Sequence, residues 1–510
     1  MTDLLIIGFD GADPALLRQW AEEGYLPHLS DLMDSGVSGE LRTTAIPITP
    51  SAWTSFMTGK NPGKHGIFDF TRINARHRLD VVNFDDNDEP TLFELMDNHT
   101  VGTLNVPATY PPRDLDNGFM VSGMMTPSID RATHDDEIKA MLEDLDYQIE
   151  VGNTFQGDNE DELLPEMEQV MDRRTDAATH LLRERDPDVF MVVFATGDRA
   201  SHWFWKHMDD DHPDHQPGDE EYSDVIRRFY MKTDEKIGEL ISQVSDDTDI
   251  VVMSDHGFTG LEKSINLNNW LIEEGYLQLR DRPLTRARYE LFKRGLTMEN
   301  VYSIVQRLNL ASIVKDVADS PDKSWIRELL SKPFLGFEDI DWDETDAYSA
   351  IHFGPIFLNA TGEHREELKH EIAQKLERLE DDGEPVIDEI EFKEDVFSGN
   401  NLHRAPDIIY RTRDMKYQSH RYFEFGSNRL FSKTHNTESG HHRMEGVFIA
   451  SGPSFTQAEI NGAEILDITP TLLHVSGYPV PDDIDGRVMH SILAEQEQEV
   501  ITSNDSELSV

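Results

Sequence analysis

Short, unbroken runs of apolar residues recur along the chain, and segments with helical periodicity lie between them. The clearest runs are Leu4 to Phe9, Val189 to Ala195, Ile250 to Met253 and Val447 to Ala450. Runs of this kind are typical of strands buried on both faces of a parallel sheet. Helical patterns pass through Leu16, Leu17 and Trp20, and occupy residues 161–185 and 222–245. The alternation predicts an α/β sandwich with a central, mostly parallel sheet and helices on both faces.

Polar residues suited to chemistry follow the first three predicted strands. Asp10 comes after the first, Asp198 after the second, and the run Ser254-Asp255-His256 after the third. In open parallel sheets, ligands bind beyond the carboxyl ends of the strands. These residues are therefore best interpreted together, as parts of one site.

The regular alternation stops in the middle of the chain and then returns. We predict a catalytic core formed by residues 1–260 and 431–494, interrupted by an insertion or cap region over residues 261–430. A last helix is predicted through Ile468, Leu472 and Leu473. Residues 495–510 are acidic and polar, so we expect a disordered tail.

The chain is strongly acidic. Lys and Arg total 46 against 99 Asp and Glu, which gives a net charge of −53. Such a surface disfavours binding to nucleic acid and to anionic membranes, because both need a basic patch. The charge indicates adaptation to a salt-rich cytoplasm, where ions screen self-repulsion, although a merely soluble acidic protein is the alternative.

The 510 residues include no cysteine. Disulfides, thiolate metal sites and cysteine nucleophiles are therefore excluded, and any metal must be held by His, Asp, Glu or hydroxyl groups. The first residues run directly into an apolar strand, without the pattern of a signal peptide, and no segment has the length and apolarity of a membrane span. We therefore expect a cytoplasmic protein.

Several segments carry candidate chemistry, and each has a plain structural alternative. Pro50 fits the first position of a helix, which would make Thr49 its N-cap, beside backbone N–H groups able to hold phosphate. Asp198 and His202 share a face if their segment is helical. The pair His441-His442 lies in what the sequence suggests is a glycine-containing loop. Taken singly, Thr49 could be an ordinary helix cap, and the Asp and His residues could be ordinary surface residues.

Taken in order, these segments resemble one family. IIGFDGAD, TPSAWTSFMTGKNPGKHGIFDF, DRASH, SDHGF and GHHRMEGVFIASGP are similar to the successive motifs of the alkaline-phosphatase superfamily, and most similar to its type I phosphodiesterase/nucleotide pyrophosphatase branch. The resemblance covers roughly residues 1–70, 185–260 and 435–490. It implies an alkaline-phosphatase-like fold and a soluble phosphohydrolase with a small phosphorylated substrate.

The resemblance also implies a centre of two divalent metal ions. One ion would be held by Asp10, Asp255, His256 and the hydroxyl of Thr49, and the other by Asp198, His202 and His442. His442 is preferred to His441 because the family's ligand lies two residues after the glycine. Three imidazoles and three carboxylates suit zinc, with manganese as the alternative. Thr49 would attack phosphorus and form a phospho-threonine intermediate.

The substrate is less well indicated. Where nucleotide pyrophosphatases have an Asn past the nucleophile, this chain has Asp69, which would repel phosphoryl oxygens unless it is protonated or turned away. Lys64, Arg199 and Arg443 are candidate substrate-binding residues, with surface ion pairing as the alternative. Both a phosphate diester and a phosphate monoester fit the sequence as substrates. A phosphoryl transferase or mutase of the same fold, or a non-catalytic metal-binding relic, are the other readings.

Overall fold

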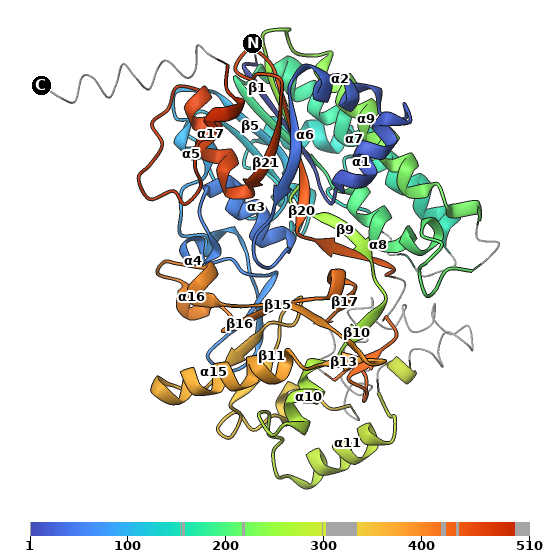
Figure 1. The fold of residues 1–510 in the computed structure, drawn as a ribbon. Coiled ribbons are helices and arrows are strands. Elements are labelled where there is room, and N and C mark those ends of the chain that lie inside the picture. Colours follow the sequence, from blue (N-terminus) through green and yellow to red (C-terminus); the bar gives the residue numbers. More distant parts are fainter. Residues whose placement is uncertain are drawn as a thin grey trace, which may run out of the picture.

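The computed structural model describes residues 2–152, 155, 159–216, 220–297, 299–301, 334–419, 425–434 and 438–494. Its larger part is built on a sheet of eight strands (Figure 1). From one edge to the other these are β21 (Ala458–Glu464), β2 (Val37–Arg42), β20 (Glu445–Ser451), β8 (Asp249–Met253), β1 (Leu4–Phe9), β7 (Val189–Phe194), β5 (Val101–Val106) and β6 (Gly118–Ser122). The predicted tail, residues 495–510, lies outside the described residues.

The sheet is parallel except for one strand. β1 pairs in parallel with β7 and with β8, and β5 pairs in parallel with β7 and β6. β20 runs antiparallel to both of its neighbours, β2 and β8. The predicted α/β sandwich with a mostly parallel sheet is therefore confirmed, and the four apolar runs match β1, β7, β8 and β20.

The register of the central strands brings their carboxyl ends level. Phe9 pairs with Phe194, and Gly8 pairs with Met253. The residues that leave these three strands consequently emerge at the same edge of the sheet.

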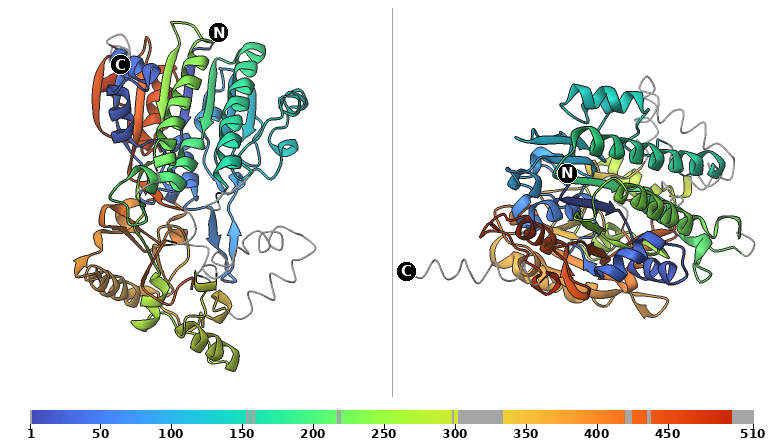
Figure 2. Two further views of the ribbon diagram at one scale, coloured as in Figure 1. Left: turned by 90° about the vertical axis from the view of Figure 1, so that its right-hand side faces the viewer. Right: turned by 90° about the horizontal axis from the view of Figure 1, so that it is seen from above.

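The side chains of β1 alternate between two hydrophobic layers. Leu5, Ile7 and Phe9 face one layer, while Leu4 and Ile6 face the other. The first layer includes residues of α1 (Pro14–Glu22), α2 (Pro27–Ser35), α6 (Asp136–Asp144), α7 (Glu160–Arg185), α8 (Thr196–Met208) and α9 (Val225–Ile241). The second includes residues of α3 (Thr49–Thr58), α5 (Leu92–Leu95) and α17 (Ile468–Val475). Figure 2 shows α7 and α9 side by side on their face of the sheet.

Helix α3 packs against β1 at a glycine. A Cβ at Gly8 would lie 2.5 Å from Cη2 of Trp53 and 2.8 Å from Cγ2 of Val193. Trp53 is itself fully buried. The missing side chain at Gly8 therefore lets α3 approach the central strand closely.

Residues 261–430 contribute a second group of elements, drawn below the large sheet in Figure 1. They form a four-stranded antiparallel sheet and, together with Phe431–Ser432, a three-stranded sheet, neither of which the sequence pattern predicted. The antiparallel sheet consists of β11 (Ala347–Ser349), β12 (Ile356–Leu358), β16 (Ile408–Thr412) and β15 (Ile387–Phe392). The other consists of β17 (Tyr417–Gln418), β10 (Lys263–Ile265) and β18 (Phe431–Ser432). The helices among the described residues of this range are α10 (Leu267–Glu273), α11 (Pro283–Lys293), α15 (Gly362–Leu376) and α16 (Lys393–Val396).

A small hydrophobic cluster joins the two groups of elements. Ile46, Ile48 and Phe68 come from the first group, and Ile351 and Phe397 from the second. Phe68 and Phe397 meet edge to face, with ring centroids 5.3 Å apart. Hydrogen bonds add to this contact, since Asn401 donates its backbone N–H to Gly63 and its side-chain amide to Lys64, both over 2.8 Å. Among the helices that the structure describes, none combines the length and the apolar character needed to cross a membrane.

Candidate metal centre

Six candidate ligands converge from four places in the fold. Asp10 directly follows β1, and Asp255 and His256 follow β8. Asp198 and His202 lie one turn apart on α8, as the helical interpretation of that segment predicted. His442 lies on β19 (Gly440–Arg443). They form two groups of three, and the groups are joined where the rings of His256 and His442 stack with centroids 3.5 Å apart.

Asp10, Asp255 and His256 form the first part of the cluster. Nε2 of His256 lies 3.3 Å from Oδ2 of Asp255 and 3.8 Å from Oδ1 of Asp10. All three side chains are completely buried. The backbone N–H of Gly11 donates to Oδ1 of Asp255 over 3.3 Å, which leaves Oδ2 directed at the imidazole.

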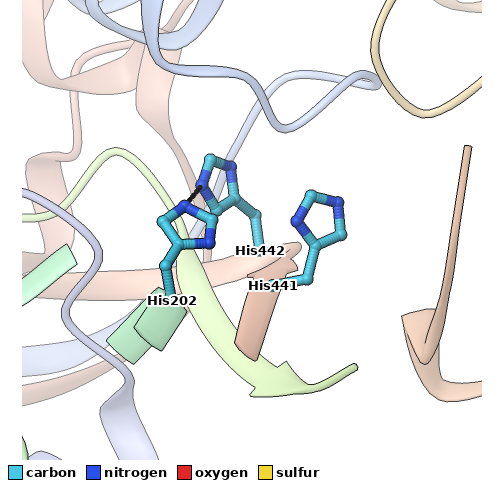
Figure 3. Close-up of side chains that lie close together, drawn as sticks. All are labelled: His202, His441 and His442. Carbon is cyan, nitrogen blue, oxygen red and sulfur yellow. Dashed lines mark hydrogen bonds between the residues drawn. The ribbon is translucent and has the colours of Figure 1, made fainter. Parts of the chain in front are cut away.

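Asp198, His202 and His442 form the second part. Oδ1 of Asp198 lies 3.5 Å from Nε2 of His202 and 3.4 Å from Nε2 of His442. The two imidazole Nε2 atoms are 3.0 Å apart and face each other in Figure 3. The sequence suggested a loop around His442, but this is wrong: β19 pairs antiparallel with β9 (Gly257–Gly260), and His442 lies opposite Phe258. The strand pairing is what carries His442 to the end of β8.

Backbone carbonyl groups orient the three imidazole rings. Nδ1 of His202 contacts the Gly440 oxygen at 3.0 Å, Nδ1 of His442 the Pro47 oxygen at 2.8 Å, and Nδ1 of His256 the Gly257 oxygen at 3.3 Å. A carbonyl only accepts, so the proton of each neutral ring lies on Nδ1 and the lone pair on Nε2. Two lone pairs facing each other across 3.0 Å, as in His202 and His442, repel unless a cation or a proton lies between them.

The buried carboxylates of the cluster likewise favour a cation or a proton beside them. Burial, and then the charge of Asp198, raise the pKa of Asp255 to about 7. Burial and the nearby Asp255 raise the pKa of Asp10 well above its usual value. For Asp198, burial acts in the same direction but is outweighed by His202 and His442, and its pKa is lowered. Burial lowers the pKa of His202 to about 4, so the ring is neutral at pH 7.

Several atoms of the cluster lack hydrogen bonds. Among the side-chain atoms of the six candidate ligands, as the structure describes them, four are buried without a hydrogen-bond partner: Asp10 Oδ1, Asp198 Oδ1, Asp255 Oδ2 and His256 Nε2. Buried polar atoms are almost always satisfied, so such a concentration is typical of a site that takes a ligand. Oxygen and imidazole nitrogen donors, oriented from outside by the backbone, fit a divalent cation.

His441 lies beside the cluster but is oriented differently. It has a possible ligand atom within 4.8 Å of those of His202 and His442. Its ring stacks on Phe353, with centroids 4.6 Å apart, and it stands away from the facing pair in Figure 3. Its centroid is 6.1 Å from that of His202, against 4.9 Å for His442. These distances favour His442 as the ligand.

Thr49 lies at the start of α3, next to the cluster. The N-cap is Ile48 rather than Thr49, so the predicted cap is wrong by one residue: Ile48 has the extended backbone (φ −122°), and Thr49 and Pro50 are the first two helical residues. Thr49 still lies where the free N–H groups of the helix start are found. It lines a cavity of about 210 Å³ together with Asp198, His202 and His442.

The three candidate substrate-binding residues lie in different places. Arg199 lines the cavity, and its Nη2 contacts Oε2 of Glu150 at 3.1 Å. Lys64 is directed elsewhere: its Nζ donates to Oδ1 of Asp485 over 2.5 Å and to the Asp483 carbonyl over 2.6 Å. Arg443 is paired with Glu445 at 3.1 Å and lines a separate groove beside Arg411 and Lys416. The structure thus brings only Arg199 to the cavity.

Two contacts near the site were not predicted. The indole of Trp53 donates to Oδ2 of Asp10 over 3.2 Å, and Trp53 lies one turn after Thr49 on α3. The spacing of four residues was the available signal for this contact. Asp69 is buried against a partner, His352, which lies 283 positions later and for which the sequence offered no signal.

The family follows from the sequence as a whole. The pattern of the type I phosphodiesterase / nucleotide pyrophosphatase family matches residues 4–443. The chain belongs to this family. Its members are metal-dependent, and the chain is accordingly a hydrolase that acts on phosphoric ester bonds. Among curated proteins, no sequence matches the chain.

Solved structures of distant relatives share the fold. Phosphonoacetate hydrolase from Sinorhizobium meliloti 1021, in complex with phosphonoformate, has a TM-score of 0.53 at 15% identity, over 92% of this chain and 94% of that one. Human ectonucleotide pyrophosphatase / phosphodiesterase 5 has a TM-score of 0.52 at 14% identity, over 97% of this chain and 100% of that one. An inactive threonine-to-alanine variant of the murine protein, in complex with AMP, has a TM-score of 0.53 at 14% identity, with the same coverage. The alkaline-phosphatase-like fold is thereby confirmed.

Proposed function

We propose that the protein hydrolyses a phosphate diester or monoester in a centre of two divalent metal ions, with Thr49 as the nucleophile. The observation that carries the proposal is the clustering of six donor residues, five of them buried, beside the cavity that Thr49 lines together with Asp198, His202 and His442. Asp10, Asp255, His256 and Thr49 would hold one ion. Asp198, His202 and His442 would hold the other. With two ions bound, the centre supplies a lower pKa for the Thr49 hydroxyl and neutralises charge on the phosphate oxygens.

The start of α3 supports Thr49 as the nucleophile of the proposal. The helix start provides N–H groups that stabilise negative charge on phosphoryl oxygens. Thr49 is almost fully buried, so the reaction takes place away from bulk water. Attack by Oγ1 on phosphorus gives a phospho-threonine intermediate, which water hydrolyses in a second step. The inactive threonine-to-alanine variant of the murine relative is in accord with a threonine nucleophile.

Zinc is the metal that the donor set favours. Three imidazoles and three carboxylates, with no cysteine in the chain, suit zinc, and manganese is the competing choice. The Nδ1 contacts to backbone carbonyls fix the rings for binding through Nε2, as is common for zinc-binding histidines.

Arg199 is the remaining candidate for substrate binding. Burial opposes its charge, but Glu150 and Asp198 raise its pKa, so the guanidinium is always charged. Its place in the cavity wall allows it to donate to a phosphate oxygen.

The test compares chromogenic substrates on metal-reconstituted protein in concentrated KCl. p-Nitrophenyl phosphate, bis-p-nitrophenyl phosphate and the p-nitrophenyl ester of a nucleoside 5′-phosphate are offered with zinc or manganese. We expect turnover of at least one, with two metal ions per chain by elemental analysis. Thr49→Ala should lower kcat by about 10³-fold or more. The control is Thr54→Ala, which removes a buried hydroxyl from the same helix, one that donates to the Pro50 carbonyl instead.

Acid quenching during turnover identifies the intermediate. Mass spectrometry should find phosphate on Thr49 in the wild type and on no residue of Thr49→Ala. Normal turnover by Thr49→Ala would refute the nucleophile. Phosphate that appears mainly on an added alcohol, rather than as free phosphate, would identify a transferase. If the protein holds both ions but turns over none of the three substrates, the alternative of a non-catalytic metal-binding relic is favoured.

A further inference from the structure

A buried carboxylate of the core holds a histidine of residues 261–430 at the wall of the Thr49 cavity. Asp69 is only 1% exposed. Its Oδ2 accepts the backbone N–H of His352 over 2.8 Å. Nδ1 of the same histidine lies 2.9 Å from Oδ1 and 2.8 Å from Oδ2. His352 lines the cavity alongside Thr49 and His442.

The carboxylate fixes which ring nitrogen carries the first proton. A carboxylate accepts hydrogen bonds, so Nδ1 of His352 is the donor, and the ring can act on a substrate only through Nε2 on its far side. An imidazole held in this way can both give and take a proton at Nε2.

The backbone around His352 is tightly constrained. Ile351 is buried in the hydrophobic cluster that joins the two groups of elements. Phe353 adopts a left-handed backbone conformation (φ +63°), which is rare for a bulky residue and persists only where the surroundings enforce it. Gly354 follows with φ +70°, and a Cβ there would lie 2.5 Å from Cβ of Ser419. Together with the edge-on packing of the ring against Phe70, at 5.4 Å, these contacts fix the imidazole in place.

We propose that His352 is a catalytic general acid that protonates the leaving alcohol, and that Asp69 is its positioning residue. This inference rests on the proposed function of Thr49. It assigns the substrate class as well: a proton donor is needed for esters of ordinary aliphatic alcohols, which leave poorly as anions, and is dispensable for nitrophenyl esters.

The proton balance closes over the two steps. Thr49 reacts as the alkoxide, its proton having passed to solvent. Its Oγ1 forms a bond to phosphorus, the bond from phosphorus to the leaving oxygen breaks, and that oxygen takes the proton from Nε2 of His352. In the second step water attacks phosphorus, its proton passes to Nε2, and the bond from phosphorus to Oγ1 breaks. Asp69 keeps its hydrogen bond to Nδ1 throughout.

The experiment measures dependence on the leaving group. The p-nitrophenyl and ethyl esters of the same phosphate are compared on zinc-loaded enzyme, with ethanol release followed by nuclear magnetic resonance. His352→Gln should change kcat/KM for the p-nitrophenyl ester by less than about threefold, and lower it for the ethyl ester by about 10²–10⁴-fold. Asp69→Asn, which keeps the shape of the side chain, should shift the ratio in the same direction by a smaller factor. The control is His403→Gln, an exposed histidine of the same region.

The outcomes separate the two proposals. An equal loss on both esters would mean that His352 is only structural or binds phosphate, and would overturn the inference. So would unchanged activity on both. If one variant does not fold, the other supplies the ratio. Absence of wild-type turnover with either ester would instead refute the proposed function, and this inference with it.

Discussion

Trp53 and Asp10 are joined by a hydrogen bond from the indole N–H to Oδ2, over 3.2 Å. Trp53 lies on the same helix as Thr49, and Asp10 leaves the central strand of the sheet. The proposed nucleophile and a proposed metal ligand are therefore fixed relative to each other by one buried side chain. The close approach at Gly8 makes this possible, because it lets the indole lie against β1.

Trp53→Phe should weaken metal binding while leaving the fold intact. Phenylalanine fills most of the space but cannot donate, so Asp10 loses its orienting partner. Removing such a partner typically costs about 10–100-fold in metal affinity. Competition against a chromogenic chelator measures the change. Trp20→Phe is the control, since Trp20 packs on Tyr230 in the other hydrophobic layer. Equal affinities of the two variants would contradict the role given to the indole.

Asp255→Asn should stabilise the metal-free protein and destabilise the metal-loaded one. The pKa of Asp255 is raised to about 7 by burial and by Asp198. A carboxyl whose pKa is raised by folding lowers the stability of the folded state as pH rises from about 4 through 7. Asparagine removes that penalty and can still accept from Gly11.

Thermal unfolding checks this expectation. After chelation, Tm of Asp255→Asn should exceed that of the wild type by at least about 2 °C at pH 8, and by less at pH 5. With saturating zinc the order should reverse, because the variant binds the ion less tightly. A lower Tm in the chelated variant at pH 8 would show that the carboxylate does not carry this cost.

His65 should make the protein sensitive to acid. The backbone N–H of Ile67 donates to its Nδ1 over 3.2 Å, and its Nε2 lies 2.9 Å from Oγ of Ser55, so the ring is neutral. Burial lowers its pKa to about 3. The unfolded chain takes up a proton below about pH 6.5 and the folded one does not, so stability present above pH 6.5 is lost as pH falls toward 3.

Urea unfolding of the wild type and His65→Gln tests this between pH 4.5 and 7. Glutamine can still donate to Ser55 but does not titrate. The slope of the free energy of unfolding against pH should be smaller in the variant by up to about 1.4 kcal/mol per pH unit, the value for one proton. Identical slopes would mean that the folded protein protonates His65 as easily as the unfolded chain does.

The net charge of −53 predicts that salt stabilises the fold. Like charges repel across the surface, and the screening length falls from about 10 Å at 0.1 M to about 3 Å at 1 M salt. Tm should therefore rise between 0.1 and 2 M KCl. Potassium glutamate should act similarly, because the effect depends on ionic strength. A flat or falling Tm would count against adaptation to a salt-rich cytoplasm.

The sequence was informative where a residue's role depends on its neighbours along the chain. The apolar run of β1 predicts a buried strand, and Asp10 comes directly after it. Asp198 and His202 are one helical turn apart, so their common face could be read from the spacing. The start of α3 was missed by one residue because Ile48, although a poor capping residue, has the extended backbone.

Contacts between distant segments were not accessible in this way. Gly440–Arg443 is short and polar and shows no strand pattern, yet it pairs with β9 across about 180 positions. The partner of Asp69 lies in a region to which the family resemblance did not extend. β2 reads VSGELR, in which only Val37 and Leu41 are apolar, and it lies in the sheet between β20 and β21.

The pairing of β19 with β9 also bears on how the enzyme is made. A nascent chain that has emerged from the ribosome only through residue 430 already carries every proposed ligand except His442. Its strands β1, β7 and β8 are already synthesised, but His442 of the proposed metal centre is not. Under the proposed function, the chain therefore becomes active only after β19 has been synthesised and has paired with β9.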